Sequence, residues 1–311
     1  MALRQVIDAY ELLDSAHVNG AAVADRLAQA GLADIVVRRI EGAERFTDFI
    51  QVRVPGKDAE APTLGIIGKL GGIGARPTQI GIVSDADGAI AAVALALKLA
   101  AMQTAGDVLP GDVILSTHIC PAAPTRPHHP VPFMSSPVDR DTLCRMEIHP
   151  KMDAVISIDT SRGNRIVNHK GIALTPTVRQ GYILPVSMPL IDILEYTTGR
   201  RAVVMPLSTQ DITPYANDLF HINSIMQPAA YTDAPVVGLA LTAETIVPGC
   251  ATGAVQMDDL DAAVRFSLEV AKRFGQDACA FHDAREFDRL QSLYGSMRRF
   301  QTAGDTSHDA L

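Results

Sequence analysis

The chain has 311 residues, of which 47% are hydrophobic and 20% are charged, a balance typical of a folded globular protein rather than a disordered one. The formal net charge is −8 and no dense run of lysine and arginine occurs, which argues against nucleic acid or a membrane surface as a partner. No apolar run reaches the roughly 18–20 residues that cross a bilayer, no signal-peptide pattern is visible, and the four cysteines form no C-x-x-C pair. We therefore expect a cytoplasmic location.

Hydrophobic periodicity predicts a regular alternation of strands and helices along the chain. Helices are expected over residues 4–13, 20–30, 89–101, 184–196, 214–225 and 258–274, and strands over 34–39, 49–54, 63–68, 79–83, 112–117, 154–159, 201–207 and 235–242. Apolar strands that alternate with helices favour a sheet covered on both faces. The predicted fold class is α/β, with three α/β/α layers around a mostly parallel mixed sheet.

The domain organisation is expected to be simple. Residues 1–275 are predicted to form a single α/β domain, because no repeat and no change of composition divides them. A Pro-rich segment near residues 121–150 is interpreted as an active-site loop, since long irregular loops in compact domains are frequently functional. Residues 276–311 are predicted to be a helical or mobile C-terminal tail.

Polar side chains gather where the predicted strands end. In an open α/β sheet, ligands bind beyond the carboxyl ends of the strands. The polar residues at these ends include Lys69, Asp85, Asp87, His118, Cys120, Asp159, Asp211 and Glu244. Carboxylates, an imidazole and a thiol at one edge are the donors that divalent metals use in proteins, although the sequence contains no local motif such as H-E-x-x-H.

Several of these residues also have an ordinary structural interpretation. Asp85 suits the cap of the apolar helix that follows it. His118 is as consistent with a hydrogen-bonded structural histidine as with a ligand, and Cys120 with a plain buried thiol. Asp159 ends an apolar run, where a carboxylate must find a partner.

Three strings resemble the metal-dependent aminopeptidases of the glutamyl and deblocking type. Residues 64–74 are similar to the strand and turn that present the first His-x-Asp pair of that family. Residues 84–89, with the apolar helix after them, resemble its bridging-aspartate motif, and residues 154–159 resemble the strand that ends in its next aspartate ligand. Residues 235–239 and 257–264 look like its last strand and final helix, so the resemblance covers roughly residues 63–274. The pattern is also similar to a bacterial family of unknown function.

The chain departs from the aminopeptidase pattern at several ligand positions. Lys69-Leu70-Gly71 stands where the first His-x-Asp is expected, and residues 117–121 replace the adjacent glutamates of the family. The final histidine is absent near residues 248–250, and the segment between Lys69 and Ser84 is too short for the usual inserted domain. Asp85 and Asp159 are the two ligand positions that carry over.

The leading hypothesis is a metal-dependent hydrolase of amide bonds in small peptides or peptide-like compounds. Zinc is the expected ion, with manganese or cobalt as alternatives, as one or two ions. The predicted metal ligands are Asp85, His118 and Asp159, joined by His128 or His129; Glu147 is the candidate general base, and Asp87, Asp211 and Glu244 are candidates for substrate binding.

Two other hypotheses stay open. A metal-free isomerase or hydrolase on the same fold would use Cys120 and Lys69, since a lysine in a Gly-rich turn can bind a carboxylate or act as a base. A non-catalytic relative would bind a peptide or an amino acid. The resemblance also implies a homo-oligomer, because the aminopeptidases commonly assemble.

Overall fold

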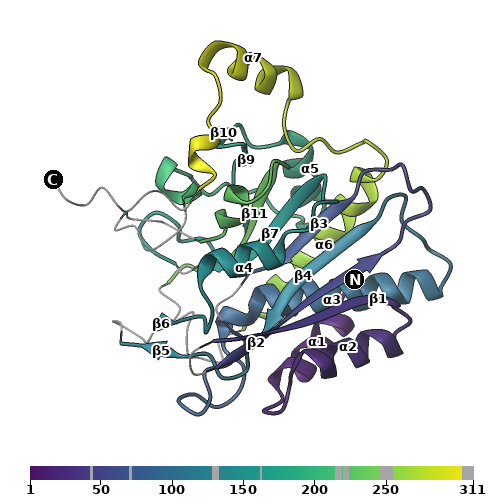
Figure 1. Cartoon of the computed structure of the whole chain (residues 1–311). Coiled ribbons are helices and arrows are strands. Elements are labelled where there is room, and N and C mark those ends of the chain that lie inside the picture. The colour runs from purple at the N-terminus through teal and green to yellow at the C-terminus, as the bar shows by residue number, and fades with distance from the viewer. Residues whose placement is uncertain are drawn as a thin grey trace.

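One mixed sheet forms the centre of the molecule (Figure 1). The computed structural model describes residues 1–42, 45–69, 72–127, 133–161, 163–213, 219, 224–245 and 255–302. Within that part of the chain the sheet runs in the order β1-β2-β4-β3-β7-β11-β9-β10, with β8 also paired to β11. Its strands are β1 (Asp34–Glu41), β2 (Phe46–Val54), β3 (Leu64–Gly68), β4 (Val113–Ile119), β7 (Ala154–Ser161), β8 (Gly171–Leu174), β9 (Thr177–Arg179), β10 (Tyr182–Leu184) and β11 (Val236–Thr242). The four central strands, β4, β3, β7 and β11, run parallel, and the outer strands are antiparallel to their neighbours.

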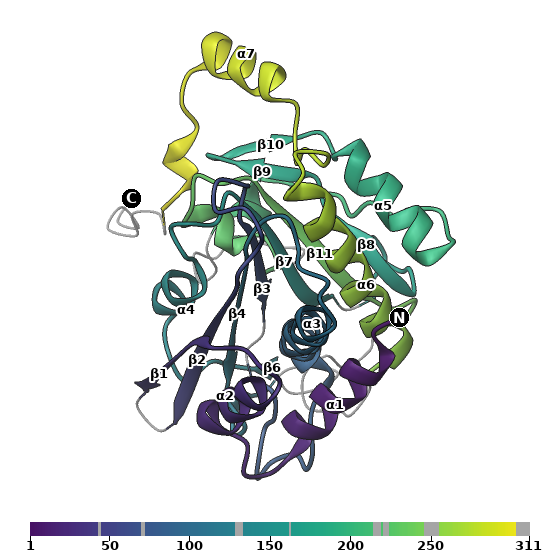
Figure 2. The ribbon, with the colours of Figure 1, turned by 90° about the vertical axis from the view of Figure 1, so that its right-hand side faces the viewer.

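Helices cover both faces of this sheet, as Figure 2 shows from the side. One face carries α1 (Leu3–Asp14), α2 (Gly20–Gln29), α3 (Asp87–Thr104), α5 (Met188–Thr198) and α6 (Met257–Phe274). The other face carries α4 (Arg140–Glu147) and the short 3-10 helices η2 (Thr209–Ile212) and η3 (Gln227–Ala230). The α3 helix is apolar around most of its circumference because it lies between the sheet and other helices and is buried along most of its length. The prediction of an α/β fold is confirmed.

Two glycines bring the start of α3 against the sheet. A Cβ atom on Gly68, the last residue of β3, would collide with the carbonyl oxygen of Gly88. A Cβ on Gly88 would in turn collide with the carbonyl oxygens of Lys69 and Ile158. Only glycine permits this backbone approach, which places the first turn of α3 and the preceding 3-10 turn η1 (Ser84–Ala86) directly at the ends of β3 and β7.

Two predicted strands do not form. Residues 79–83 are not a strand, because Gly81 adopts a positive φ of 83° that interrupts an extended run. Residues 201–207 contribute only one isolated bridge, between Val204 and Leu174; Pro206 lacks the N–H that a longer ladder needs. The short strands β8, β9 and β10 were not predicted, and most of the predicted helix over 214–225 lies outside the described residues.

The Pro-rich segment and the tail both contain regular structure. Residues 121–150 include the small two-stranded sheet of β5 (Thr125–Arg126) and β6 (Phe133–Met134), followed by α4, which Asp139 caps by accepting from the Thr142 N–H. The tail contains α7 (Ala284–Tyr294), which stands away from the main body in Figure 1, and η4 (Arg298–Phe300). Phe287 anchors α7 edge-on against Tyr182 of β10, with ring centroids 6.0 Å apart.

None of the helices in the described part of the chain is both long and apolar enough to span a membrane.

Candidate active site

A buried ion pair lies at the carboxyl end of β3. Lys69 follows the last residue of this strand, and its backbone N–H donates to the Ile158 carbonyl at 2.8 Å. Its Nζ donates to Glu147 Oε2 at 2.8 Å, and the Cys144 Sγ lies 3.7 Å away. The side chains of Lys69 and Glu147 are only 5% and 0% exposed, so the pair is shielded from water. The last turn of α4 therefore closes over the end of the central sheet.

The electrostatics of this pair keep Lys69 charged. Burial by itself lowers the pKa of the ammonium, but the neighbouring Cys144 and Glu147 side chains reverse that effect and raise it above its ordinary value. Burial also raises the pKa of Glu147, and the Lys69 ammonium opposes part of that shift. A lysine in this state is a fixed positive charge rather than a base.

Asp159 lies beside that fixed charge. It belongs to β7, the strand next to β3, and is 4% exposed. Its Oδ2 accepts a hydrogen bond from the Ser224 hydroxyl at 2.8 Å. Burial, together with the charge of Asp85, raises the pKa of this carboxyl to about 8, while Ser224 and Lys69 limit the shift. An acid with this pKa exchanges its proton near neutral pH, which is what acid–base catalysis requires.

Asp85 and Asp87 approach the same edge from the start of α3. Asp85 is half-buried in η1, and its charge raises the pKa of both Asp87 and Asp159. Asp87 is 5% exposed, and its pKa is raised well above the ordinary value, first by burial and then by the other carboxylates around it. Side chains from three separate segments of the chain thus meet at the carboxyl ends of β3 and β7.

His118 and Cys120 are both buried and held by contacts at the end of β4. The His118 Nδ1 lies 2.7 Å from the Thr47 hydroxyl, and its ring packs against Phe49 with centroids 5.3 Å apart. Cys120 is fully buried in a small apolar cluster that includes Val83 and Met134. Burial raises the pKa of the Cys120 thiol to about 11, so little thiolate forms at neutral pH.

The remaining predicted residues divide into three groups. Asp211 is fully buried and caps η2, where its Oδ2 accepts from the Ser208 N–H and hydroxyl, each at 2.8 Å. Glu244 is exposed beyond the end of β11, at the rim of a cavity that also contains Asp87. His128 and His129 lie outside the described residues.

The described donors do not fit the expected metal site. Within the described part of the chain, no three His, Cys, Asp or Glu side chains converge as a group that could hold a metal ion. A lysine, whose ammonium cannot bind a metal ion, follows β3 where the aminopeptidase pattern has a ligand. We therefore derive no chemical step through a metal ion.

Two residues of the site were not predicted. Cys144 stands one helical turn before Glu147 on α4, and Ser224 lies just before η3. The spacing of Cys144 and Glu147 places both on one face of a helix, a signal that could have been read once residues 140–147 were recognised as helical. No signal in the sequence pairs Ser224 with Asp159.

The fold is similar to that of solved aminopeptidase-like structures, a mixed, largely parallel sheet covered by helices on both faces. The solved structure of the bottromycin maturation enzyme BotP is similar with a TM-score of 0.54 and 19% identity, covering 89% of this chain and 70% of that one. A structure of the same enzyme in complex with Mn matches with a TM-score of 0.50, 18% identity, and 86% and 71% of the two chains. The cytosol aminopeptidase from Coxiella burnetii is similar with a TM-score of 0.53 and 16% identity, over 88% of this chain and 68% of that one.

The chain belongs to the protein family described as "Protein of unknown function (DUF1177)", whose model matches residues 38–304. None of the curated proteins compared with it by sequence matches. At these identities the structural likeness establishes the fold alone.

Proposed function

We propose that the chain hydrolyses amide bonds in small peptide-like compounds, with the chemistry at the carboxyl ends of β3 and β7. The observation that carries this proposal is that a buried ammonium, Lys69, and a carboxyl of raised pKa, Asp159, follow paired residues of two neighbouring strands at one buried edge. The fold supports it, because BotP and the cytosol aminopeptidase share the architecture.

The roles follow from the charges. An amide carbonyl that binds beside Lys69 places its oxygen against a positive charge, which stabilises the oxyanion that forms when water attacks the carbonyl carbon. Asp159 in its ionised form accepts a proton from that water and then gives it to the leaving nitrogen, as the carbon–nitrogen bond breaks. One water is consumed, and a carboxylic acid and an amine are released. Glu147 acts as a positioning residue, because its carboxylate holds the Lys69 ammonium in place.

The test measures amine release from a panel of dipeptides, amino acid amides and cyclic amides with the purified full chain. Asp159→Asn should abolish release, whereas Asp153→Asn, at the other end of the same strand, should leave it unchanged. Turnover that is equal in wild type and Asp159→Asn would overturn the proposal, as would tight ligand binding without any turnover.

The predicted metal is tested in the same assay. Zinc, manganese or cobalt bound by Asp85 and Asp159 would give stoichiometric metal in the purified protein and activity that a chelator removes. Elemental analysis of wild type and of the Asp85→Ala/Asp159→Ala double variant therefore distinguishes a metal-dependent from a metal-free reaction. Size-exclusion chromatography of the same samples tests the predicted homo-oligomer.

A further inference from the structure

A cavity of about 270 Å³ lies at the carboxyl ends of β7 and β11, beside the proposed catalytic pair. Segments from five parts of the chain meet there: the start of α3, the end of β7, the residue before β8, the end of β11 with the residues after it, and the start of α6. Its polar lining includes Asp87, Ser161, Lys170, Thr242, Glu244 and Asp259. The volume suits a small organic molecule rather than a single ion.

Three polar atoms of this lining are buried without a partner. They are Asp87 Oδ1, Ser161 Oγ and Thr242 Oγ1, none of which has a hydrogen-bond partner among the described residues. The three residues are only 5%, 8% and 5% exposed. Native structures leave few buried polar groups unsatisfied, because each one costs about 1–3 kcal/mol. Three in one cavity indicate that something else completes them.

The charged side chains that line the cavity indicate which kind of ligand it can bind. Three carboxyl side chains, Asp87, Glu244 and Asp259, face one ammonium, that of Lys170. The Lys170 ammonium also lies 3.8 Å from the carboxylate of Asp258. Asp258 precedes Asp259 on α6, and its side chain is 71% exposed. Burial, followed by the neighbouring Asp258, raises the pKa of Asp259 to about 6. A cation would relieve this crowding of acids, whereas an anion would add to it.

We propose that this cavity binds the ammonium group of a small organic amine. An ammonium group carries three N–H donors, and the cavity offers three unpartnered oxygen atoms that can accept them. Among the described residues no group of three His, Cys, Asp or Glu side chains fits a metal ion, so an organic cation is the better match. This site does not depend on the proposed hydrolysis, because binding can be measured without turnover.

The experiment is a calorimetric titration of the full chain with propylamine, with propanol and propionate as controls of similar shape. Wild type should bind propylamine saturably, and neither control should bind. Asp87→Asn should weaken propylamine binding by about tenfold or more, because one charge-assisted hydrogen bond is lost. Thr242→Val, which removes one acceptor and keeps the shape, should weaken it by a smaller factor.

The matched control is Asp192→Asn, which removes an exposed acid on α5, outside the lining of the cavity. It should bind propylamine as wild type does. Equal weakening in Asp192→Asn and Asp87→Asn would show a general charge effect and overturn the proposal. So would saturable binding of propionate, or the absence of saturable propylamine binding to wild type. Thermal unfolding of each variant separates a loss of binding from a loss of fold.

Discussion

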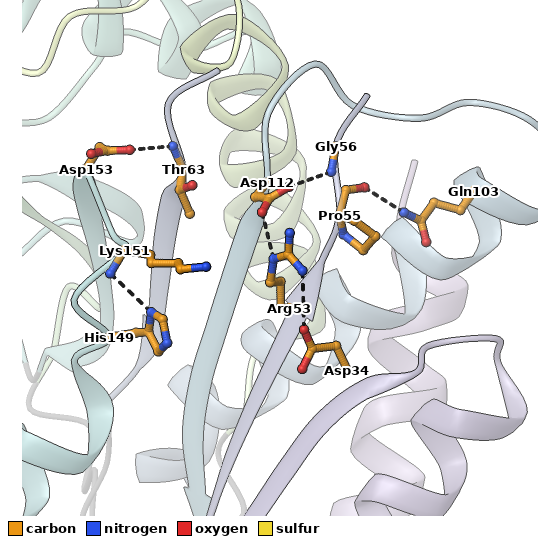
Figure 3. Close-up of polar contacts among 10 residues, drawn as sticks. All are labelled: Asp34, Arg53, Pro55, Gly56, Thr63, Gln103, Asp112, His149, Lys151 and Asp153. Atoms are coloured by element: carbon orange, nitrogen blue, oxygen red, sulfur yellow. Dashed lines mark hydrogen bonds and ion pairs between the residues drawn. The ribbon is translucent and has the colours of Figure 1, made fainter. Parts of the chain in front are cut away.

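At the amino ends of the parallel strands, the carboxylates shown in Figure 3 all have partners, whereas the carboxyl ends hold several buried polar atoms that have none among the residues that the structure describes. Asp112, just before β4, accepts from Arg53 Nε at 2.7 Å and from the Gly56 N–H at 2.8 Å. Asp153, just before β7, accepts from the Thr63 N–H at 2.8 Å. At the opposite edge, Glu147 Oε1 and Asp87 Oδ1 are buried and have no hydrogen-bond partner in the described part of the chain.

This difference separates structural polar groups from functional ones. Folding alone favours the pairing seen at the amino edge, since an unpaired buried group lowers stability. Unpaired groups that persist at the carboxyl edge are retained against that cost, as is typical of binding sites. A larger cavity of about 1120 Å³ is lined by three carboxylates, Asp141, Asp153 and Asp233, and all three hold partners. Its one buried atom without a partner among the described residues is a donor, Arg179 Nε, rather than a carboxylate oxygen.

The largest expected effect is a loss of catalytic activity, and it is measured by comparing substitutions near the two ends of β7. Asp159→Asn should lower kcat/KM for amide substrates by about 10²–10⁴-fold, because it removes the proposed acid–base group. Asp153→Asn, at the amino end of the same strand, should change kcat/KM by about twofold or less, although it weakens one hydrogen bond to Thr63. Steady-state kinetics on both variants measures the contrast, and equal losses would show that the effect is one of strand stability.

The second prediction concerns the buried ion pair of Lys69 and Glu147. Glu147→Leu should lower the free energy of unfolding by about 3–5 kcal/mol, because it leaves the Lys69 ammonium buried without its carboxylate. The double variant Lys69→Met/Glu147→Leu should recover most of that loss, since no uncompensated charge remains. Urea denaturation of the two variants checks this, and a double variant as unstable as the single one would refute the argument.

The third prediction is a pH dependence. The pKa of Asp159 is raised from an ordinary 3.8 to about 8, so the folded state binds more protons than the unfolded state between these values. The contribution of Asp159 to stability is therefore fully present below about pH 4 and is lost as the pH rises through about 8, at up to about 1.4 kcal/mol per pH unit. Other carboxyls titrate too, so the measurement is the difference in unfolding free energy between wild type and Asp159→Asn across that window. A difference that does not vary with pH would contradict the shifted pKa.

The smallest change in stability is expected for the carboxylates at the amino ends of the strands. Asp112→Asn should lower the free energy of unfolding by about 1–2 kcal/mol, because the Arg53 side chain is 39% exposed and water replaces much of the ion pair. Asp34→Asn, which removes the longer 3.5 Å contact to the same arginine, should cost only a few tenths of a kcal/mol. Neither variant should alter propylamine binding. A loss of binding in either one would mean that the two edges are coupled.

Much of the fold could be predicted from the sequence, because its central strands are continuous apolar runs. The runs at residues 63–68, 112–117, 154–159 and 235–242 all correspond to parallel strands, and the polar residues that follow them mark one edge. The failures have local causes: Gly81 and Pro206 break runs whose composition is typical of strands.

The side-chain partners within the site could not be predicted in the same way. Lys69 and Asp159 could be placed at the edge by strand order, but the orientation of His118 depends on Thr47 from the antiparallel strand β2, which no local pattern places beside it. The Glu147 contact depends on α4, a helix of eight residues within a Pro-rich segment that sequence periodicity did not separate from a loop. The catalytic roles of Lys69, Cys120 and Glu147 stay predictions, as do the ligand roles of Asp85 and Asp159.

The contact between Gly68 and Gly88 limits how this protein can vary. Every other amino acid adds a Cβ that would meet a carbonyl oxygen at these positions, so neither glycine can be replaced without moving α3 away from the sheet. That movement would carry Asp85 and Asp87 away from Asp159, since both lie within four residues of Gly88 on the chain. The geometry of the acidic cluster is thus tied to two residues that have no side chains, and mutational scans should find these positions as intolerant as the carboxylates themselves.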